Sequence, residues 1–553
     1  MSQATLRQER YDRHSLIANY DQGSLEAVSL AMVSPETEIG NFALGALAAL
    51  GAGSKDGSGI SLYTNAGYDP ARHQGFLFKN GLPGEPCVDA LADMCFQINP
   101  YPHIIPRCER IAYGSDDRFL DKGADILIVT SNDPYAKRTV LEYAMRNDKT
   151  CILAASTHDN AEIHIVHPPQ EQTLTEERKA ELEISYRLAL SPHYEGLEQG
   201  IDTSLFAATI ITAEVVRQAM PGLYTGVSYD RSAPRSVYFN RQIAHVAQIA
   251  GHPVEYVQRV ANHFRPIMVD GKPFVSQGSK PDFSGRTIAV AGCGAIGNSL
   301  VPVIARYNPK KLYLIDPDEV AVSNLARQIN FPMRSRRRES LEKSASELEE
   351  ALQREVIGHS KAQIMAQRTV EMVPSLEGRV VPVVLKVQDT EQLFEQVLAG
   401  QHGIDIREID TWFGCVDNMQ ARAFFTELTA RNGIDYHDGA STALISQVYD
   451  SIGGETACLD CTKDVIRRAI AEREHQEEAE RRAGCIDVHQ GSVIYTNMFA
   501  AFGLAVKAVA RARRDNSQGA IGYGFQFSTN NPTYAASFDA DYLAPCRCHE
   551  NKE

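Results

Sequence analysis

The chain has 553 residues, of which 43% are hydrophobic, and its formal net charge is −15 at pH 7. This length is enough for the cores of two or three domains, and the acidic balance argues against nucleic acid as the principal partner, because binding phosphates needs a basic surface. The first residues lack an apolar segment and no run of about 18 apolar residues occurs, so we expect a cytoplasmic protein that does not engage a membrane. The 11 scattered cysteines fit metal ligation or nucleophilic use better than a disulfide framework.

The first half of the chain alternates strand and helix patterns. Residues 27–63 have the order strand, turn, helix and second strand, residues 124–133 form a further apolar strand, and residues 204–219 form a long apolar helix. This alternation predicts an α/β domain over residues 1–220.

The segment between the halves, residues 221–283, is rich in Pro, Gly and Ser at both ends. Its middle, from Arg241 to Phe264, has a helical pattern. We therefore expect a linker with a small helical element.

The second half repeats the strand, turn and helix order with glycines in the turn. A β-branched strand over residues 287–291 leads into three spaced glycines, Gly292, Gly294 and Gly297. Glycines at such a turn let the backbone approach a phosphate, which the helix N-terminus attracts. After the helix, a second strand ends at Asp316 and Asp318, which are placed to bind ribose hydroxyls. The glycine motif alone would also fit a dehydrogenase.

The residues that follow narrow the assignment. The run from Asp316 to Gln328 reads Asp-x-Asp-x-Val-x-x-Ser-Asn-Leu-x-Arg-Gln, which resembles the nucleotide signature of the ubiquitin-activating superfamily. That superfamily includes the sulfur-carrier activators of thiamin and molybdopterin synthesis, and its members adenylate the C-terminal glycine of a protein. The resemblance implies a Rossmann-like, doubly wound adenylation domain over residues 284–553 that uses ATP and Mg²⁺.

The resemblance also implies the residues of the ATP site. Lys361 ends an Ile-Gly-x-x-Lys sequence and would contact the transferring phosphate, and Asp417, in an Asp-Asn-x-x-x-Arg sequence that ends at Arg422, would hold Mg²⁺. The implied nucleotide-binding residues are Gly292, Gly294, Gly297, Asp316, Asp318, Asn324, Arg327, Gln328 and Lys361.

The first half resembles an inactive copy of the second. Both helices begin with Ile-Gly-Asn, but the turn over residues 34–38 reads Ser-Pro-Glu-Thr-Glu, so two glycines are missing and carboxylates would repel phosphates. Activating enzymes of ubiquitin-like proteins pair an inactive with an active half, which implies an intrachain pseudo-dimer; a general likeness of doubly wound folds is the alternative. In that family an arginine reaches across the interface to the ATP phosphates, and Arg13 is our candidate, with the similar sequence at residues 238–242 as a competitor.

The connection from Gln328 to Lys361 contains 32 residues, which is longer than is usual in the family. Residues 340–355 have helical periodicity without Gly or Pro. We expect either a helix near the ATP cleft that helps to hold the protein substrate, or a solvated insertion.

Cysteines of two kinds lie in the C-terminal region. Two short-spaced pairs suit a tetrahedral structural Zn²⁺ that staples this region, as in family members, with four free thiols as the alternative: Cys458, Cys461, Cys546 and Cys548. Cys485 follows a charged, arginine-containing stretch and precedes a predicted helix, surroundings that favour a thiolate. The family places its acyl-accepting cysteine there, so we expect Cys485 to be catalytic rather than structural. Cys293 and Cys415 are expected to pack beside the nucleotide.

Together these features predict ATP-dependent activation of the C-terminal glycine of a ubiquitin-like protein, thioester formation on Cys485, and transfer to a ubiquitin-conjugating-type enzyme. The arrangement is most similar to the activating enzymes of bacterial ubiquitin-like conjugation operons with a role in antiviral defence. The alternative is a sulfur-carrier-protein or peptide adenylating enzyme without stable thioester transfer. Because five residues follow Cys548, we expect no further ubiquitin-fold domain and recruitment of a conjugating enzyme through another surface.

Overall fold

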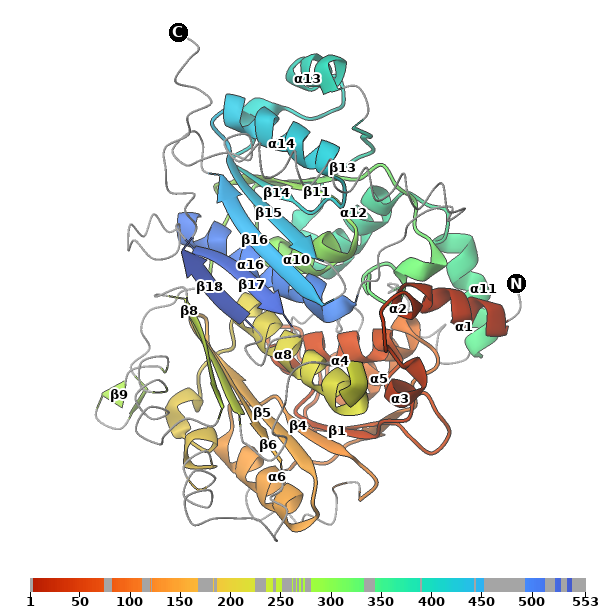
Figure 1. The fold of residues 1–553 in the computed structure, drawn as a ribbon, viewed down its shortest axis with the longest axis vertical. Coiled ribbons are helices and arrows are strands. Elements are labelled where there is room, and N and C mark those ends of the chain that lie inside the picture. The colour runs from red at the N-terminus through yellow and green to blue at the C-terminus, as the bar shows by residue number, and fades with distance from the viewer. Residues whose placement is uncertain are drawn as a thin grey trace.

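The computed structural model has two eight-stranded mixed sheets covered by helices (Figure 1). The residues that it describes are 3–73, 82–111, 120, 122–167, 183, 186–223, 235–241, 245–250, 261, 265, 268–269, 272–273, 280–332, 344–387, 390–441, 444–451, 493–512, 523–528 and 535–539. The statements below concern these residues.

The first sheet has the strand order β3-β2-β1-β4-β5-β6-β7-β8. Strands β1 to β5 pair in parallel, and β6, β7 and β8 extend the sheet in antiparallel fashion. The central strands β1 and β4 are buried apolar runs, as expected for parallel strands covered on both faces. The bounds are β1 Leu30–Val33, β2 Ile60–Tyr63, β3 Ile104–Arg107, β4 Ile126–Val129, β5 Thr150–Ser156, β6 Asn160–Val166, β7 Arg235–Asn240 and β8 His245–Ala250.

The second sheet repeats this topology strand for strand, in the order β13-β12-β11-β14-β15-β16-β17-β18. Its first five strands are again parallel and its last three antiparallel. The predicted tandem of two Rossmann-like α/β units is therefore confirmed. The bounds are β11 Thr287–Ala291, β12 Lys311–Ile315, β13 Val380–Val383, β14 Thr411–Gly414, β15 Asp435–Ser441, β16 Ile445–Ser451, β17 Tyr523–Ser528 and β18 Ala535–Asp539, with a small separate ladder of β9 Met268–Val269 and β10 Lys272–Pro273.

The helices connect and cover these strands. Those of the first half are α1 Gln3–Arg10, α2 Asp12–Ser15, α3 Gln22–Glu26, α4 Glu38–Leu50, α5 Cys87–Ile98, α6 Pro134–Arg146 and α8 Ile201–Ala219. Those of the second half are α10 Ala295–Arg306, α11 Ala345–Glu355, α12 Lys361–Met372, α13 Thr390–Leu398, α14 Met419–Arg431 and α16 Ile494–Ala512. Short 3-10 turns include η6 Val322–Asn324 and η8 Ile406–Glu408.

Four helices form the contact between the two sheets: α4, α8, α10 and α16 (Figure 1). One continuous core contains apolar side chains from both halves. Within it the ring of Phe502 lies 4.8 Å from that of Phe206 and 4.9 Å from that of Phe239. A buried bidentate ion pair adds polar specificity, since both terminal nitrogens of Arg306 lie 2.6 Å from a carboxylate oxygen of Glu38.

Two expectations about connecting segments have different outcomes. The predicted helix between the halves is wrong for residues 245–250, which form strand β8 beside β7 in the first sheet. This strand pairs with β7 in the antiparallel part of the first sheet, a tertiary contact that the sequence alone does not reveal. The helix predicted in the long insertion is confirmed as α11, which starts with a capping box of Ser344 and Glu347.

Candidate functional site

The turn from β11 to α10 forms an open backbone cradle. Gly292 has φ +96°, and a Cβ atom there would collide with the carbonyl of Cys415 in the neighbouring strand segment. A Cβ on Gly297 would collide with the carbonyl of Gly292, whereas a Cβ on Gly294 would meet nothing within 4 Å. Gly294 is the N-cap of α10 and no side chain caps it, so the first amides of the helix face open space. These are the requirements of an anion site at a helix N-terminus.

Asp316 braces this turn from the end of β12. One carboxylate oxygen accepts a hydrogen bond from the amide of Cys293 at 2.6 Å, and the other accepts from the amide of Asp318 at 2.9 Å. Burial raises the pKa of Asp316 to about 6, although the charge of Lys361 acts in the opposite direction. Asp316, which we predicted to bind ribose hydroxyls, thus stabilises the glycine turn through both carboxylate oxygens. Asp318 is the more accessible of the two carboxylates, because its side chain is 62% exposed.

Lys361 is anchored beside Asp318. Its amide donates to the Asp318 carbonyl at 2.9 Å, and its ammonium lies 2.9 Å from the Asp318 carboxylate. A β-bridge between Glu319 and Ser360 fixes the two segments together. The ammonium group of the first residue of α12 is therefore held next to the carboxyl edge of the parallel strands, where ligands bind in doubly wound folds.

Arg327 joins the two halves electrostatically. It is buried, and its guanidinium donates to the carbonyl of Ser323 at 2.7 Å. Burial lowers its pKa to about 10, the positive charge of Arg13 lowers it further, and the charge of Asp417 opposes both effects. The structure thus brings Arg13, Arg327 and Asp417 into one electrostatic neighbourhood, as expected if they share an anionic ligand.

Helix α1, which directly precedes the short helix α2 that carries Arg13, contacts η6 in the other half. Asn324, in η6, accepts a hydrogen bond from the amide of Ala321 at 3.0 Å and so closes this turn. The side-chain oxygen of Gln328 is buried and has no hydrogen-bond partner among the described residues. The competing arginine, Arg241, is held inside the first half by Asp202, 2.5 Å from its guanidinium, which favours Arg13.

Asp417 and Arg422 have different surroundings. Asp417 follows β14 and is exposed, so its oxygens are available to a hard cation. Arg422 is buried and donates to the carbonyls of Val416 at 2.6 Å and Gly439 at 2.9 Å, and it pairs with the buried Asp438. Arg422 therefore supports the loop that carries Asp417. Sequence reasoning missed Asp438, because its strand, β15, has a polar sequence that does not reveal the burial of this carboxylate.

The equivalent turn of the first half is closed. Ser34 occupies the position of Gly292 and has φ +60°, and a Cβ atom on Gly40 would lie 2.5 Å from the carbonyl of Pro35. The turn also contains Glu36, whose pKa burial raises to about 7 while a hydrogen bond with Thr64 opposes the shift. The first half has thus kept the shape of the turn and replaced its phosphate-facing surface by a carboxyl group.

The cysteines divide into those described and those outside the described residues. Cys293 and Cys415 are buried in the core, and burial raises the pKa of both thiols, which confirms packing as their role. The predicted acyl acceptor, Cys485, lies outside the described residues, as do the four predicted zinc ligands, Cys458, Cys461, Cys546 and Cys548. Within the described part of the chain no group of three or more potential metal ligands occurs, and no helix there has the length and apolar character to cross a membrane.

Comparison with known proteins identifies the class of the second half. Residues 273–533 match the ThiF family. This match spans just under half of the chain and lies in the half that resembles the superfamily of adenylating enzymes.

Individual relatives are distant. Ubiquitin-like modifier-activating enzyme 5 of Branchiostoma floridae is 25% identical over 182 residues, which cover 32% of this chain and 40% of that protein. The chain thus spans less than half the length of this curated relative. Among solved structures, E. coli MccB with ATP is 13% identical, with a TM-score of 0.36 and coverage of 71% of this chain and 97% of that one. E. coli MccB with AMPCPP and MccA is 16% identical, with a TM-score of 0.34 and coverage of 46% and 64%.

Proposed function

We propose that the second half activates the C-terminal carboxylate of a ubiquitin-like protein by adenylation with ATP. A carboxylate oxygen attacks the α-phosphate, the bond between the α- and β-phosphates breaks, and pyrophosphate leaves. The observation that supports the proposal is that the charges of Arg13, from the first half, and of Asp417 both act on the buried Arg327. In addition, Lys361 pairs with Asp318 just after β12, and no side chain caps the N-terminus of α10. This arrangement supplies positive charge where negative charge moves during the displacement.

Each cation has a role in this proposal. Arg327 and Arg13 bind the phosphates from opposite halves of the chain, and Lys361 leaves Asp318 for the phosphate that ATP brings. The exposed carboxylate of Asp417 fits Mg²⁺, which neutralises phosphate charge when bound. The side-chain oxygen of Gln328 is buried without a hydrogen-bond partner among the described residues, and in this proposal it accepts a hydrogen bond from the nucleotide.

The adenylation proposal is tested by ATP–pyrophosphate exchange in the presence of a ubiquitin-like protein that ends in glycine. We expect exchange by the native chain, its loss in Asp417→Ala, and its retention in Cys485→Ala. Exchange that survives Asp417→Ala, or that needs no C-terminal glycine, would count against the proposal.

We further propose that the thiolate of Cys485 displaces AMP to form a thioester, which then passes to a ubiquitin-conjugating-type enzyme. Support comes from the basic residues before Cys485 and from the similarity to a ubiquitin-like modifier-activating enzyme. Operons for bacterial antiviral conjugation are the context that the sequence resemblance favours, and Zn²⁺ on the two cysteine pairs would staple the region.

A reducible adduct with the ubiquitin-like protein on a non-reducing gel, absent in Cys485→Ala, is the expected result. Pyrophosphate exchange without any adduct would instead favour the second candidate, a sulfur-carrier or peptide adenylating enzyme. The MccB structure solved with MccA motivates keeping that candidate in the test.

A further inference from the structure

The insertion helix α11 is docked on the first half rather than projecting into solvent. One face of it is apolar and fully buried in the shared core, through Leu348, Leu352 and the following Val356. Glu350, on the opposite face, is exposed. In Figure 1, α11 lies beside α1, at the end of the molecule where the chain begins. Its inner face is therefore already occupied and is not free to hold a protein substrate.

A buried carboxylate fixes this docking. Glu349 is 5% exposed although it sits on a surface insertion. One of its carboxylate oxygens accepts a hydrogen bond from the hydroxyl of Tyr101, in the first half. The other is buried without a hydrogen-bond partner among the described residues. Burial of a carboxylate costs free energy unless a positive charge or a hydrogen-bond donor compensates it. Glu349 therefore needs a positive charge nearby in addition to the Tyr101 hydroxyl.

The compensating charge comes from the N-terminal segment. Arg10 is 1% exposed, its guanidinium donates to the carbonyl of Ile98 at 2.9 Å, and the charge of Glu349 favours its protonated form. Burial lowers the pKa of Arg10, and the charge of Glu349 opposes this shift, so Glu349 acts electrostatically on a buried cation three residues before Arg13.

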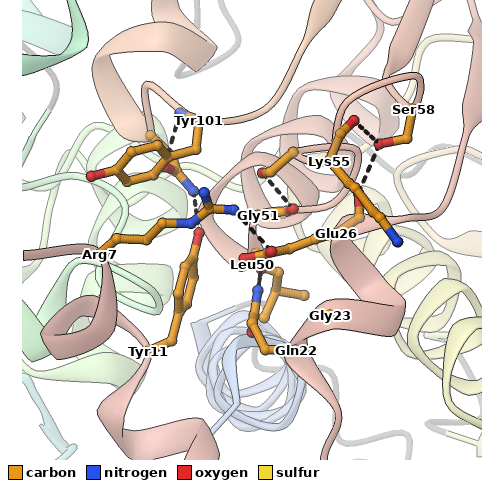
Figure 2. A network of polar contacts seen from close by, with 12 residues as sticks. Arg7, Tyr11, Gln22, Gly23, Glu26, Leu50, Gly51, Lys55, Ser58 and Tyr101 are labelled. Carbon is orange, nitrogen blue, oxygen red and sulfur yellow. Dashed lines mark hydrogen bonds and ion pairs between the residues drawn. The ribbon is translucent and has the colours of Figure 1, made fainter. Parts of the chain in front are cut away.

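A wider network holds the same segment in place (Figure 2). The guanidinium of Arg7 lies over the ring of Tyr101, 4.9 Å from its centroid, and 2.8 Å from the carboxylate of Glu26. The hydroxyl of Tyr11 accepts a hydrogen bond from the amide of Asn99 at 2.7 Å. Figure 2 shows Arg7 and Tyr11 converging below Tyr101, so the ring that binds Glu349 is also the one that α1 packs against.

The far end of α11 leads directly into the phosphate site. The chain passes from Val356 to Lys361 in one short turn, where the amide of Gly358 donates to the Val320 carbonyl and the amide of Val320 donates to the His359 carbonyl, both at 2.9 Å. A shift of α11 would therefore move both the Arg10–Arg13 segment and the Lys361 turn.

We infer that Glu349 is a positioning residue for adenylation: by binding Tyr101 and acting electrostatically on Arg10, it locks the inactive half onto the active half so that Arg13 stays beside Arg327. The inference rests on the proposed function, because Arg13 matters only if a phosphate lies between the two arginines. It assigns the long insertion the role of a strut between the halves.

The test is a double-mutant cycle of Glu349→Ala and Arg13→Ala, read as kcat for ATP–pyrophosphate exchange by the full chain. Arg13→Ala alone should reduce kcat by roughly 100-fold or more. Glu349→Ala alone should reduce it by roughly 10-fold, and Arg13→Ala should then cost at least about 5-fold less in the Glu349→Ala background than in the native chain. The matched control is Glu350→Ala, on the exposed face of the same helix, which should leave kcat unchanged.

Glu349→Gln separates positioning from general stability, because its amide oxygen can still accept from Tyr101. It should regain most of the activity that Glu349→Ala loses, and Tyr101→Phe should resemble Glu349→Ala. If the two substitutions reduced kcat independently, so that their effects multiplied, the positioning role of Glu349 would be wrong and the proposed function would stand. The same conclusion would follow if Glu349→Ala left kcat unchanged while Arg13→Ala reduced it. A silent Arg13→Ala would overturn the role of Arg13 and the strut together.

Discussion

Arg327 is the residue at which the electrostatics of the site converge. Burial of Arg327 and the positive charge of Arg13, in the first half, together lower its pKa to about 10. The negative charge of Asp417, in the second half, opposes this shift. A buried cation beside a second cation is unfavourable on its own. A multiply charged anion between the two arginines would relieve this repulsion, and in the proposed function that anion is ATP.

We predict that Arg327→Ala reduces pyrophosphate exchange by about 100- to 1,000-fold, the loss typical of removing one charge-stabilising donor. Because removal also relieves repulsion with Arg13, the thermal midpoint should not fall. The control is Arg407→Ala, whose side chain is 84% exposed and paired with Asp405, and which should be silent. Equal activity of the two variants would contradict this account of the site.

His14 makes a second prediction, about pH. Burial lowers its pKa from 6.5 to about 4, a hydrogen bond with Gln22 opposes the shift, and the charge of Arg327 adds to it. Between these two pKa values the unfolded chain binds a proton that the folded chain does not, so stability must fall as pH drops below about 6.5. At pH 5 the loss is about 2 kcal/mol relative to neutral pH.

His14→Gln should remove that contribution. We expect the difference in urea midpoint between pH 7.5 and pH 5 to be smaller in His14→Gln than in the native chain. Parallel losses in both proteins would show that His14 does not carry this pH dependence.

At the scale of elements, two glycines of the β11–α10 turn should have different roles, one in the stability of the fold and the other in ATP binding. Gly292→Ala places a side chain at φ +96° and against the Cys415 carbonyl, so it should destabilise the fold by at least about 2 kcal/mol. Gly294→Ala has open space around its new methyl group and should cost less than about 1 kcal/mol. That methyl group would lie where phosphates approach, so ATP affinity should nevertheless fall at least tenfold.

Thermal unfolding and calorimetric ATP titration distinguish these effects. If Gly294→Ala bound ATP as tightly as the native chain, the cradle would not be the phosphate site.

Much of the order of helices and strands could be predicted, because the hydrophobic periodicity of the sequence changes where glycines and other turn residues occur. The strands at 287–291 and 311–315, the glycine turn and helix α11 all carry local signals that agree with the fold. Strand β8 could not be predicted, because its pairing with β7 joins an edge that is created only by tertiary structure.

For the candidate site, the sequence indicated which residues are involved but not which contacts they make. The motifs identified Arg327 and Lys361 as candidate site residues, but they gave no sign that Asp316 binds two backbone amides or that Glu349 reaches Tyr101. The Tyr101–Glu349 contact joins residues 248 positions apart, and its geometry follows from packing of the two halves. The Asp316 contacts lie within the second half and depend on how the β11–α10 turn meets the end of β12.

At the scale of the whole molecule, one topology occurs twice and has diverged. The Arg306–Glu38 ion pair joins α10 to α4, the helices that follow the glycine turn and its counterpart in the first half. Glu36 adds a buried carboxyl group to the first-half turn, and Thr64 follows β2 as Asp316 follows β12.

We therefore predict that calorimetry finds a single ATP bound per chain. Glycines introduced at Ser34 and Glu36 should not add a second, because the acidic residues that follow the second strand are also missing. Two nucleotides per native chain would contradict the assignment of an inactive half.

The most direct test of adenylation is mass spectrometry of a ubiquitin-like protein that binds the chain, after incubation with ATP, Mg²⁺ and the Cys485→Ala variant. With no acceptor thiol present, we predict AMP on its C-terminal carboxylate, and no such product when Arg327→Ala is added to Cys485→Ala. Phosphate in place of AMP, AMP on a side chain, or an unmodified C-terminus would contradict the account.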